Sequence, residues 1–195
     1  MKKTVGIVAP IVGGTHYHAD FALRLSQNQR ELTLKTLYQL TQNGWQVEKI
    51  GRDFQYEEMG TAAGYYLSTI LRQEGYQTTL TTTYGDEALQ RLADADPFAV
   101  CLSTTMVIDT PSLMTLTRRI RQYVPNALLI AGGMFIWKSY YTSQAYQGVD
   151  KERDDTPLTV FQQDSSELGI DVFVIAPHGR EALLQVLQEA ERGSR

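Results

Sequence analysis

The chain has 195 residues, a formal net charge of −4 and a hydrophobic content of 43%. This length suits a single domain with a substantial core, and the acidic balance argues against the basic footprint of nucleic-acid binders. The single cysteine, Cys101, excludes an intrachain disulfide and an iron–sulfur cluster held by this chain alone. The longest apolar run, residues 127–137, is too short for a membrane span of about 20 residues. The cytoplasm is therefore the expected location.

The first predicted element is a strand over Thr4–Ala9, because this run is continuous, apolar and rich in β-branched residues. Lys2 and Lys3 before it also resemble the start of a secretory signal. However, Pro10 interrupts the apolar run and no convincing cleavage site follows, so a buried first strand is favoured.

The next segment, residues 12–58, holds more chain than one crossover needs, and we interpret it as an N-terminal helical extension. Leucines at helical spacing predict a helix over residues 26–43, which Gly44 would end. A short strand could follow at residues 45–50.

From residue 59 onward, segments with helical spacing alternate with short strand-like segments. Glycine ends the first of these helices, and Pro111 marks the first turn of another that opens at Asp109 or Thr110. Helices are predicted at residues 59–74, 86–92, 110–123 and 181–191. Strands are predicted at residues 76–83, 98–103, 127–131 and 172–176.

This alternation predicts one α/β domain over residues 1–195, with right-handed βαβ units and helices on both faces of a parallel sheet. The expected architecture is a Rossmann-like (flavodoxin-like) doubly wound sheet in three layers, α/β/α. One polar insertion, residues 148–169, lies outside the pattern, and residues 158–162 within it could add an edge strand.

In such a sheet the ligand lies beyond the carboxyl ends of the strands, where the strand order switches. Two loops there are candidates. Ser103, Thr104 and Thr105 offer hydroxyls to a ligand, or they cap turns and helix starts. Gly132 and Gly133 allow a ligand to approach the backbone, or they make a tight turn with positive φ. If a ligand lies there, a side chain at Gly133 should harm binding more than folding.

Histidine and aromatic residues also fall near this edge. His16 and His18 follow the first strand, and His178 lies in the loop Pro177–Gly179 after the last, but no Asp, Glu or Cys completes a recognisable metal site. Trp137, Tyr140 and Tyr141 form a helical stripe after the double glycine. This stripe suits either core packing or the wall of a flat ligand site.

Motifs of catalysis are missing from the sequence. It contains no Gly-x-Ser-x-Gly, no Walker loop and no Gly-x-Gly-x-x-Gly after a strand. We therefore assign no catalytic residue.

Four blocks of the sequence combine strands, helices and glycines in one pattern. The blocks are GTAAGYYLSTILRQEGYQTTLTTT (60–83), DPFAVCLSTT (96–105), RRIRQYVPNALLIAGG (118–133) and DVFVIAPHGREALLQVL (171–187). Together they resemble the cobalamin-binding domain at the N-terminus of B12-dependent radical SAM enzymes. The resemblance covers residues 60–190 apart from the insertion, and residues 1–11 fit as the first strand.

The resemblance implies a corrinoid over the carboxyl edge of the sheet. Its cofactor-binding positions are Ser103, Thr104, Thr105, Gly132, Gly133, Pro177, His178 and Gly179. The Asp-x-His-x-x-Gly motif of other B12 domains is absent, so cobalt is expected to have no histidine of this chain as its lower ligand. The alternative is His16, with Asp20 as the acceptor that fixes the other ring nitrogen. The three-cysteine radical SAM motif is also absent, so this chain cannot start radical chemistry.

The expected function is therefore a corrinoid-binding module. It would present cobalamin to a partner domain, such as a methyltransferase or radical SAM domain, without being an enzyme by itself. The alternative is a flavodoxin-like small-molecule enzyme or a nucleotide- or flavin-binding domain, against which the missing phosphate loop argues. Nucleic acid and membrane are not expected partners.

Overall fold

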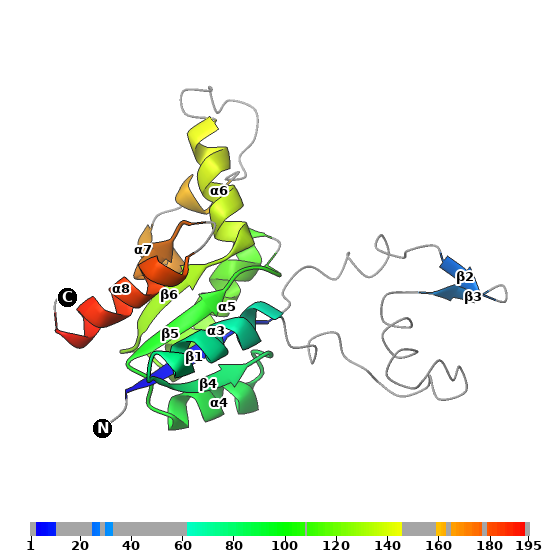
Figure 1. Ribbon diagram of the computed structural model, residues 1–195. Coiled ribbons are helices and arrows are strands. Elements are labelled where there is room, and N and C mark those ends of the chain that lie inside the picture. Colours follow the sequence, from blue (N-terminus) through cyan, green and yellow to red (C-terminus); the bar gives the residue numbers. More distant parts are fainter. Residues whose placement is uncertain are drawn as a thin grey trace.

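A five-stranded parallel sheet forms the centre of the computed structural model, which describes residues 3–10, 25–27, 30–32, 62–107, 109–145, 159–162, 165–176 and 179–193 (Figure 1). Its strands, in spatial order, are β4 (Gln77–Thr81), β1 (Thr4–Val8), β5 (Ala99–Ser103), β6 (Leu128–Gly132) and β7 (Val172–Val174). This is the strand order of flavodoxin-like doubly wound sheets, in which the winding reverses beside the first strand. The predicted α/β, Rossmann-like fold is confirmed, and the reversal lies between β1 and β5.

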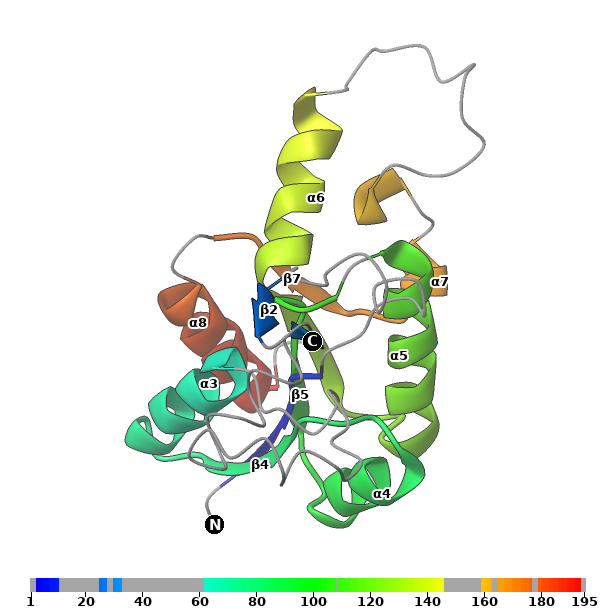
Figure 2. The same ribbon diagram turned by 90° about the vertical axis from the view of Figure 1, so that its right-hand side faces the viewer.

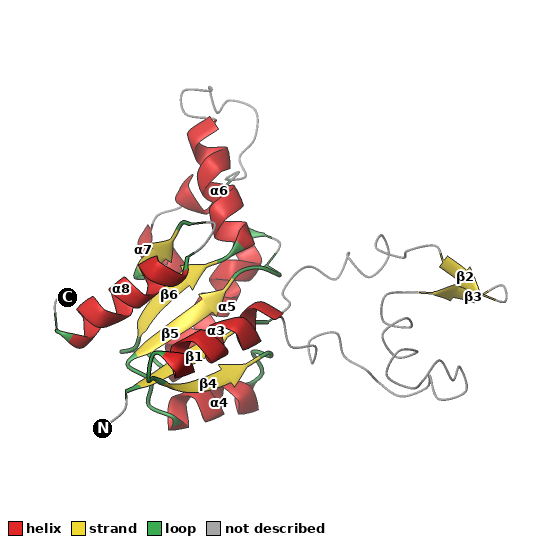
Figure 3. Ribbon diagram, viewed as in Figure 1, coloured by secondary structure: helices red, strands yellow, loops and turns green. Residues whose placement is uncertain are grey.

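Helices cover both faces of the sheet and make the three predicted layers (Figures 2 and 3). On one face, α3 (Ala62–Gln73) and α8 (Arg180–Glu191) bury Leu71, Leu183 and Leu187 against the sheet. On the other, α4 (Asp86–Asp94) and α5 (Thr110–Tyr123) bury leucines such as Leu92 and Leu116. Each fully buried leucine stabilises the fold by roughly 1.5–3 kcal/mol. No helix in the described part of the chain is long and apolar enough to cross a membrane.

The start of α5 follows the predicted signals. The Asp109 carboxylate accepts a hydrogen bond from the Ser112 N–H at 2.7 Å, and Pro111 lies in the first turn. An N-cap of this kind satisfies one of the N–H groups that a helix start leaves without a partner. Because Asp109 caps α5, the hydroxyls of residues 103–105 do not serve as caps of that helix.

Helix α6 (Met134–Ala145) extends away from the sheet, beyond the carboxyl end of β6 (Figure 1). Its aromatic residues continue a chain of ring contacts that begins on β7. Phe173 lies 5.1 Å from Phe161, Phe161 lies 5.6 Å from Tyr140, and Tyr140 lies 5.4 Å from Tyr141, measured between ring centroids. The predicted aromatic stripe thus packs partly as core, although Tyr141 remains 52% exposed.

The prediction of a helix over residues 26–43 is wrong where the structure describes this segment. Strands β2 (Leu25–Gln27) and β3 (Arg30–Leu32) pair antiparallel, with Leu25 opposite Leu32. The helical pattern rested on leucines at 32, 37 and 40, and only the first of these is described. In these residues the backbone hydrogen bonds run between paired strands and not along a helix. The remainder of the predicted 12–58 helical extension, including the strand at 45–50, lies outside the described residues.

The possible edge strand at residues 158–162 is also wrong in its described part. Val160–Gln162 forms the 3₁₀ helix η3, followed by the short helix α7 (Ser165–Leu168). The Gln162 side chain accepts a hydrogen bond from the Thr159 N–H at 3.0 Å, and the Gln162 N–H donates to the Thr159 carbonyl at 3.2 Å. These two bonds close a turn and leave the backbone too curved for a strand. The rest of the 148–169 insertion is described only at residues 165–169.

Cys101 lies in the middle of β5 and is 3% exposed, as the apolar sequence around it predicted. Burial raises the pKa of its thiol to about 12. The thiolate is the reactive form of cysteine, so this residue is inert in the folded chain.

We expect the free energy of unfolding to fall less steeply with rising alkaline pH in Cys101→Ala than in the wild type. The thiol pKa is about 12 in the folded chain against a reference value of 9.0, so only the unfolded chain ionises within this window. Ionisation of the unfolded state lowers the free energy of unfolding as pH rises, by about 1.4 kcal/mol per pH unit. Urea unfolding of both proteins at pH 8, 9.5 and 11 checks this. Parallel pH profiles would contradict it.

Candidate functional site

The carboxyl edge of the sheet brings together most of the predicted positions. Ser103 ends β5 and residues 104–107 follow it, while Gly132 ends the neighbouring strand β6 and Gly133 follows it. The end of β1, Ala9-Pro10, lies on the other side of β5, at the winding reversal where ligands of such sheets bind. Ser103 pairs with Gly132 in the sheet register, so the two loops start side by side.

Thr104 links these two loops through four hydrogen bonds. Its N–H donates to the Gly132 carbonyl at 2.8 Å, and its hydroxyl donates to the same oxygen at 2.9 Å. Its carbonyl accepts from the Phe135 N–H, and its hydroxyl accepts from the Ile136 N–H, each at 3.3 Å. Thr104 is fully buried. The Thr104 hydroxyl, which was predicted to contact a ligand, instead bonds the Gly132 carbonyl and the Ile136 N–H at the start of α6.

Gly133 supplies a turn that other residues would strain. Its φ is +113°, in the region that favours glycine. A Cβ added there would lie 3.0 Å from the Thr105 nitrogen and 3.1 Å from the Thr104 nitrogen. These values support the interpretation of the double glycine as a tight turn with positive φ. At Gly133 the close contact is with the backbone of the loop after β5.

The other two glycines of the predicted site pack against one side chain of β7. A Cβ on Gly132 would lie 3.3 Å from the Val174 Cβ, and one on Gly179 would lie 2.8 Å from the Val174 Cγ1. Gly132 thus lets β7 approach β6, and Gly179 lets the start of α8 approach β7.

The described residues at this edge form an uncharged and partly apolar surface. Thr105 and Gly133 are exposed, whereas the Ser103 side chain is 5% exposed and its hydroxyl donates to the Thr105 hydroxyl at 3.3 Å. Met106 and Met134 are 42% and 57% exposed. The described segments after the strands, residues 9–10, 82–84, 103–107, 132–133 and 175–176, carry no charged side chain. Met134 was not predicted, and the only sequence signal was its place directly after the double glycine.

Several predicted positions lie outside the described residues. These are His16, His18, Pro177 and His178. Among residues that the structure describes, no group of three or more His, Cys, Asp or Glu side chains could hold a metal ion.

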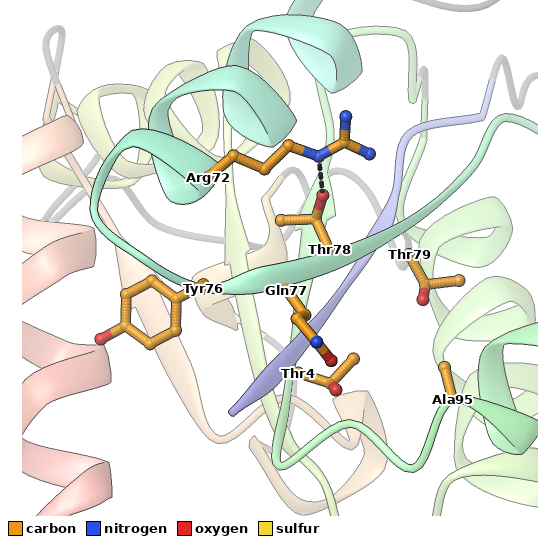
Figure 4. A pocket seen from close by; sticks show the side chains of 7 residues that line it. All are labelled: Thr4, Arg72, Tyr76, Gln77, Thr78, Thr79 and Ala95. Atoms are coloured by element: carbon orange, nitrogen blue, oxygen red, sulfur yellow. Dashed lines mark hydrogen bonds between the residues drawn. The ribbon is translucent and has the colours of Figure 1, made fainter. Parts of the chain in front are cut away.

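A separate hollow lies at the amino ends of β1 and β4, on the outer side of β4 (Figure 4). It has a volume of about 460 Å³ and is lined mainly by polar residues. Its lining consists of Thr4, Arg72, Tyr76, Gln77, Thr78, Thr79 and Ala95. The Arg72 Nε donates to the Thr78 hydroxyl at 2.7 Å, so the one cation in its lining is turned onto the strand. We place the candidate site at the carboxyl edge, after β5 and β6 and next to the winding reversal, and not at this hollow.

Comparison with known proteins adds little to this geometry. No family model matches the sequence, and no curated protein matches it. One solved structure similar to the chain is the chemotaxis protein CheY4 of Vibrio cholerae, at 12% sequence identity and a TM-score of 0.47, over 97% of this chain and 98% of that one. The class of the protein, a doubly wound α/β domain, is therefore assigned from its own strand order.

Proposed function

We propose that the chain is a corrinoid-binding module that holds cobalamin over the carboxyl edge of its sheet. The observation that carries this proposal is that the described residues after β5 and β6 carry no charge at the carboxyl edge, where Thr105, Met106, Gly133 and Met134 are exposed. Cobalamin is a large ligand whose ring is apolar on its faces and bears neutral amides at its rim, and such a surface suits it. The sequence resemblance to cobalamin-binding domains supports the same ligand.

The proposed role is to present the upper face of the corrinoid to a partner catalytic domain. When bound, the corrinoid supplies cobalt chemistry such as methyl transfer. The residues of this chain contribute binding: Thr105 offers a hydroxyl, Gly133 offers an open surface, and the two methionines offer polarizable apolar contact.

We expect the purified protein to retain about one equivalent of corrinoid after incubation with hydroxocobalamin and gel filtration, as measured by its absorption spectrum. Retention of flavin in a parallel incubation, with no corrinoid, would favour the flavodoxin-like alternative. A sample that retains neither would contradict the proposal.

A matched pair of variants locates the site. Met134→Glu places a carboxylate on the edge, and it should weaken hydroxocobalamin binding by about tenfold or more because a charge must lose water on contact. The fold should tolerate it, since acidic residues are favourable in the first turn of a helix. Gln77→Glu places the same charge on the exposed lining of the hollow and should leave binding unchanged. Equal effects of the two variants would mean that the edge is not the site.

A further inference from the structure

Helix α6 begins without a capping side chain of its own. The Trp137 N–H donates to the Gly133 carbonyl at 3.0 Å, which places Gly133 at the N-cap position. Glycine has no side chain that could accept from the next N–H groups of the helix. The residue that does so comes from another loop, 32 positions earlier in the chain: the Thr104 hydroxyl accepts from the Ile136 N–H.

We propose that Thr104 is the positioning residue of the corrinoid site, in that it fixes the loop after β5, the double glycine and the start of α6 as one rigid unit. This inference rests on the proposed function. Four of its hydrogen bonds reach Gly132, Phe135 and Ile136 and use its N–H, carbonyl and hydroxyl. Three exposed residues of the site, Thr105, Gly133 and Met134, adjoin residues that these bonds hold. The fourth, Met106, precedes Val107, whose N–H donates to the same Thr104 carbonyl at 3.3 Å.

Because Thr104 is buried, removing its hydroxyl should leave its two hydrogen-bond partners unsatisfied. The side chain is 0% exposed, so water does not replace a lost hydrogen bond, and the Gly132 carbonyl and Ile136 N–H lose a partner. Thr104→Val keeps the shape and removes the hydroxyl. Thr104→Ser keeps the hydroxyl and removes one methyl group.

The chain also contains a matched control. Thr117 on α5 is likewise 0% exposed, and its hydroxyl donates to the Met114 carbonyl at 3.1 Å, within the helix and away from the edge. Thr117→Val therefore removes a buried hydroxyl without touching the loops. A general loss of stability would show equally in both valine variants.

The test measures hydroxocobalamin affinity and amide hydrogen exchange in all three variants. Thr104→Val should weaken binding by about tenfold or more, because two hydrogen bonds are lost, and Thr104→Ser should bind within about threefold of the wild type. Thr117→Val should bind as the wild type does. In the ligand-free protein, the Ile136 amide should exchange faster in Thr104→Val alone.

The inference is overturned if Thr104→Val binds as tightly as the wild type, or if Thr117→Val weakens binding equally. If Thr104→Val does not fold, the comparison of Thr104→Ser with Thr104→Ala decides in the same way. If the wild type binds no corrinoid, the proposed function fails. The exchange measurement then still decides whether Thr104 holds α6, and an unchanged Ile136 rate would refute that role.

Discussion

Gly133→Val should lower the free energy of unfolding by about 2–5 kcal/mol, as the sum of backbone strain and a close contact. The residue has a φ of +113°, and its added Cβ would lie 3.0 Å from the Thr105 nitrogen and 3.1 Å from the Thr104 nitrogen. Backbone atoms cannot move aside as the end of a side chain can. The sequence alone predicted that such a change would harm binding more than folding, and these contacts revise that prediction.

A second glycine provides the control for this variant. Gly75 follows α3 with a φ of +92°, and a Cβ there would meet no atom within 4 Å. In Gly75→Val, backbone strain alone should therefore lower the free energy of unfolding, by about 1–3 kcal/mol. Urea unfolding of the two variants measures both losses. Equal losses would show that the contact with the loop after β5 costs nothing.

Arg121→Met should lower the free energy of unfolding by about 2–4 kcal/mol, because several backbone carbonyls lose their charged hydrogen-bond donor at the same time. The Arg121 Nε donates to the Gly169 carbonyl at 2.9 Å, and its Nη1 donates to the Ala127 carbonyl at 2.7 Å. Its Nη2 pairs with Asp171, which also accepts from the Leu129 N–H. Arg121 thereby joins the end of α5 to the starts of β6 and β7.

The matched variant is Arg119→Met, two residues earlier on the same helix. Arg119 forms a salt bridge with Asp86, whose side chain is 82% exposed, and exposed ion pairs contribute about 1 kcal/mol or less. Thermal or urea unfolding should separate the two variants clearly. A loss in Arg119→Met as large as that in Arg121→Met would contradict the assignment.

The parts of the fold that the sequence predicted well have local signals. Asp109 and Pro111 mark the start of α5 within three residues, and residues 99–102 around Cys101 are apolar at every position, as in a strand buried on both faces. Once strands and helices alternate in this way, the doubly wound sheet is the architecture that buries the strands on both faces.

The parts that the sequence did not predict depend on distant residues. Thr104 could be identified as a hydroxyl near the ligand edge, but its partner Ile136 is 32 residues away. Gly132 and Gly179 both approach Val174, which no local pattern indicates. The antiparallel pairing of Leu25–Gln27 with Arg30–Leu32 was missed because the helical spacing came mainly from leucines further along the chain.

The central claim is that the carboxyl edge of the sheet binds a corrinoid, and hydrogen exchange with and without hydroxocobalamin tests it most directly. Bound ligand should slow exchange in residues 103–107 and 132–136, where the two loops held by Thr104 meet. Exchange around the hollow on β4, at residues 76–79, should not change. Protection at residues 76–79 without protection at 103–107 and 132–136, or no protection at a saturating concentration, would contradict the account.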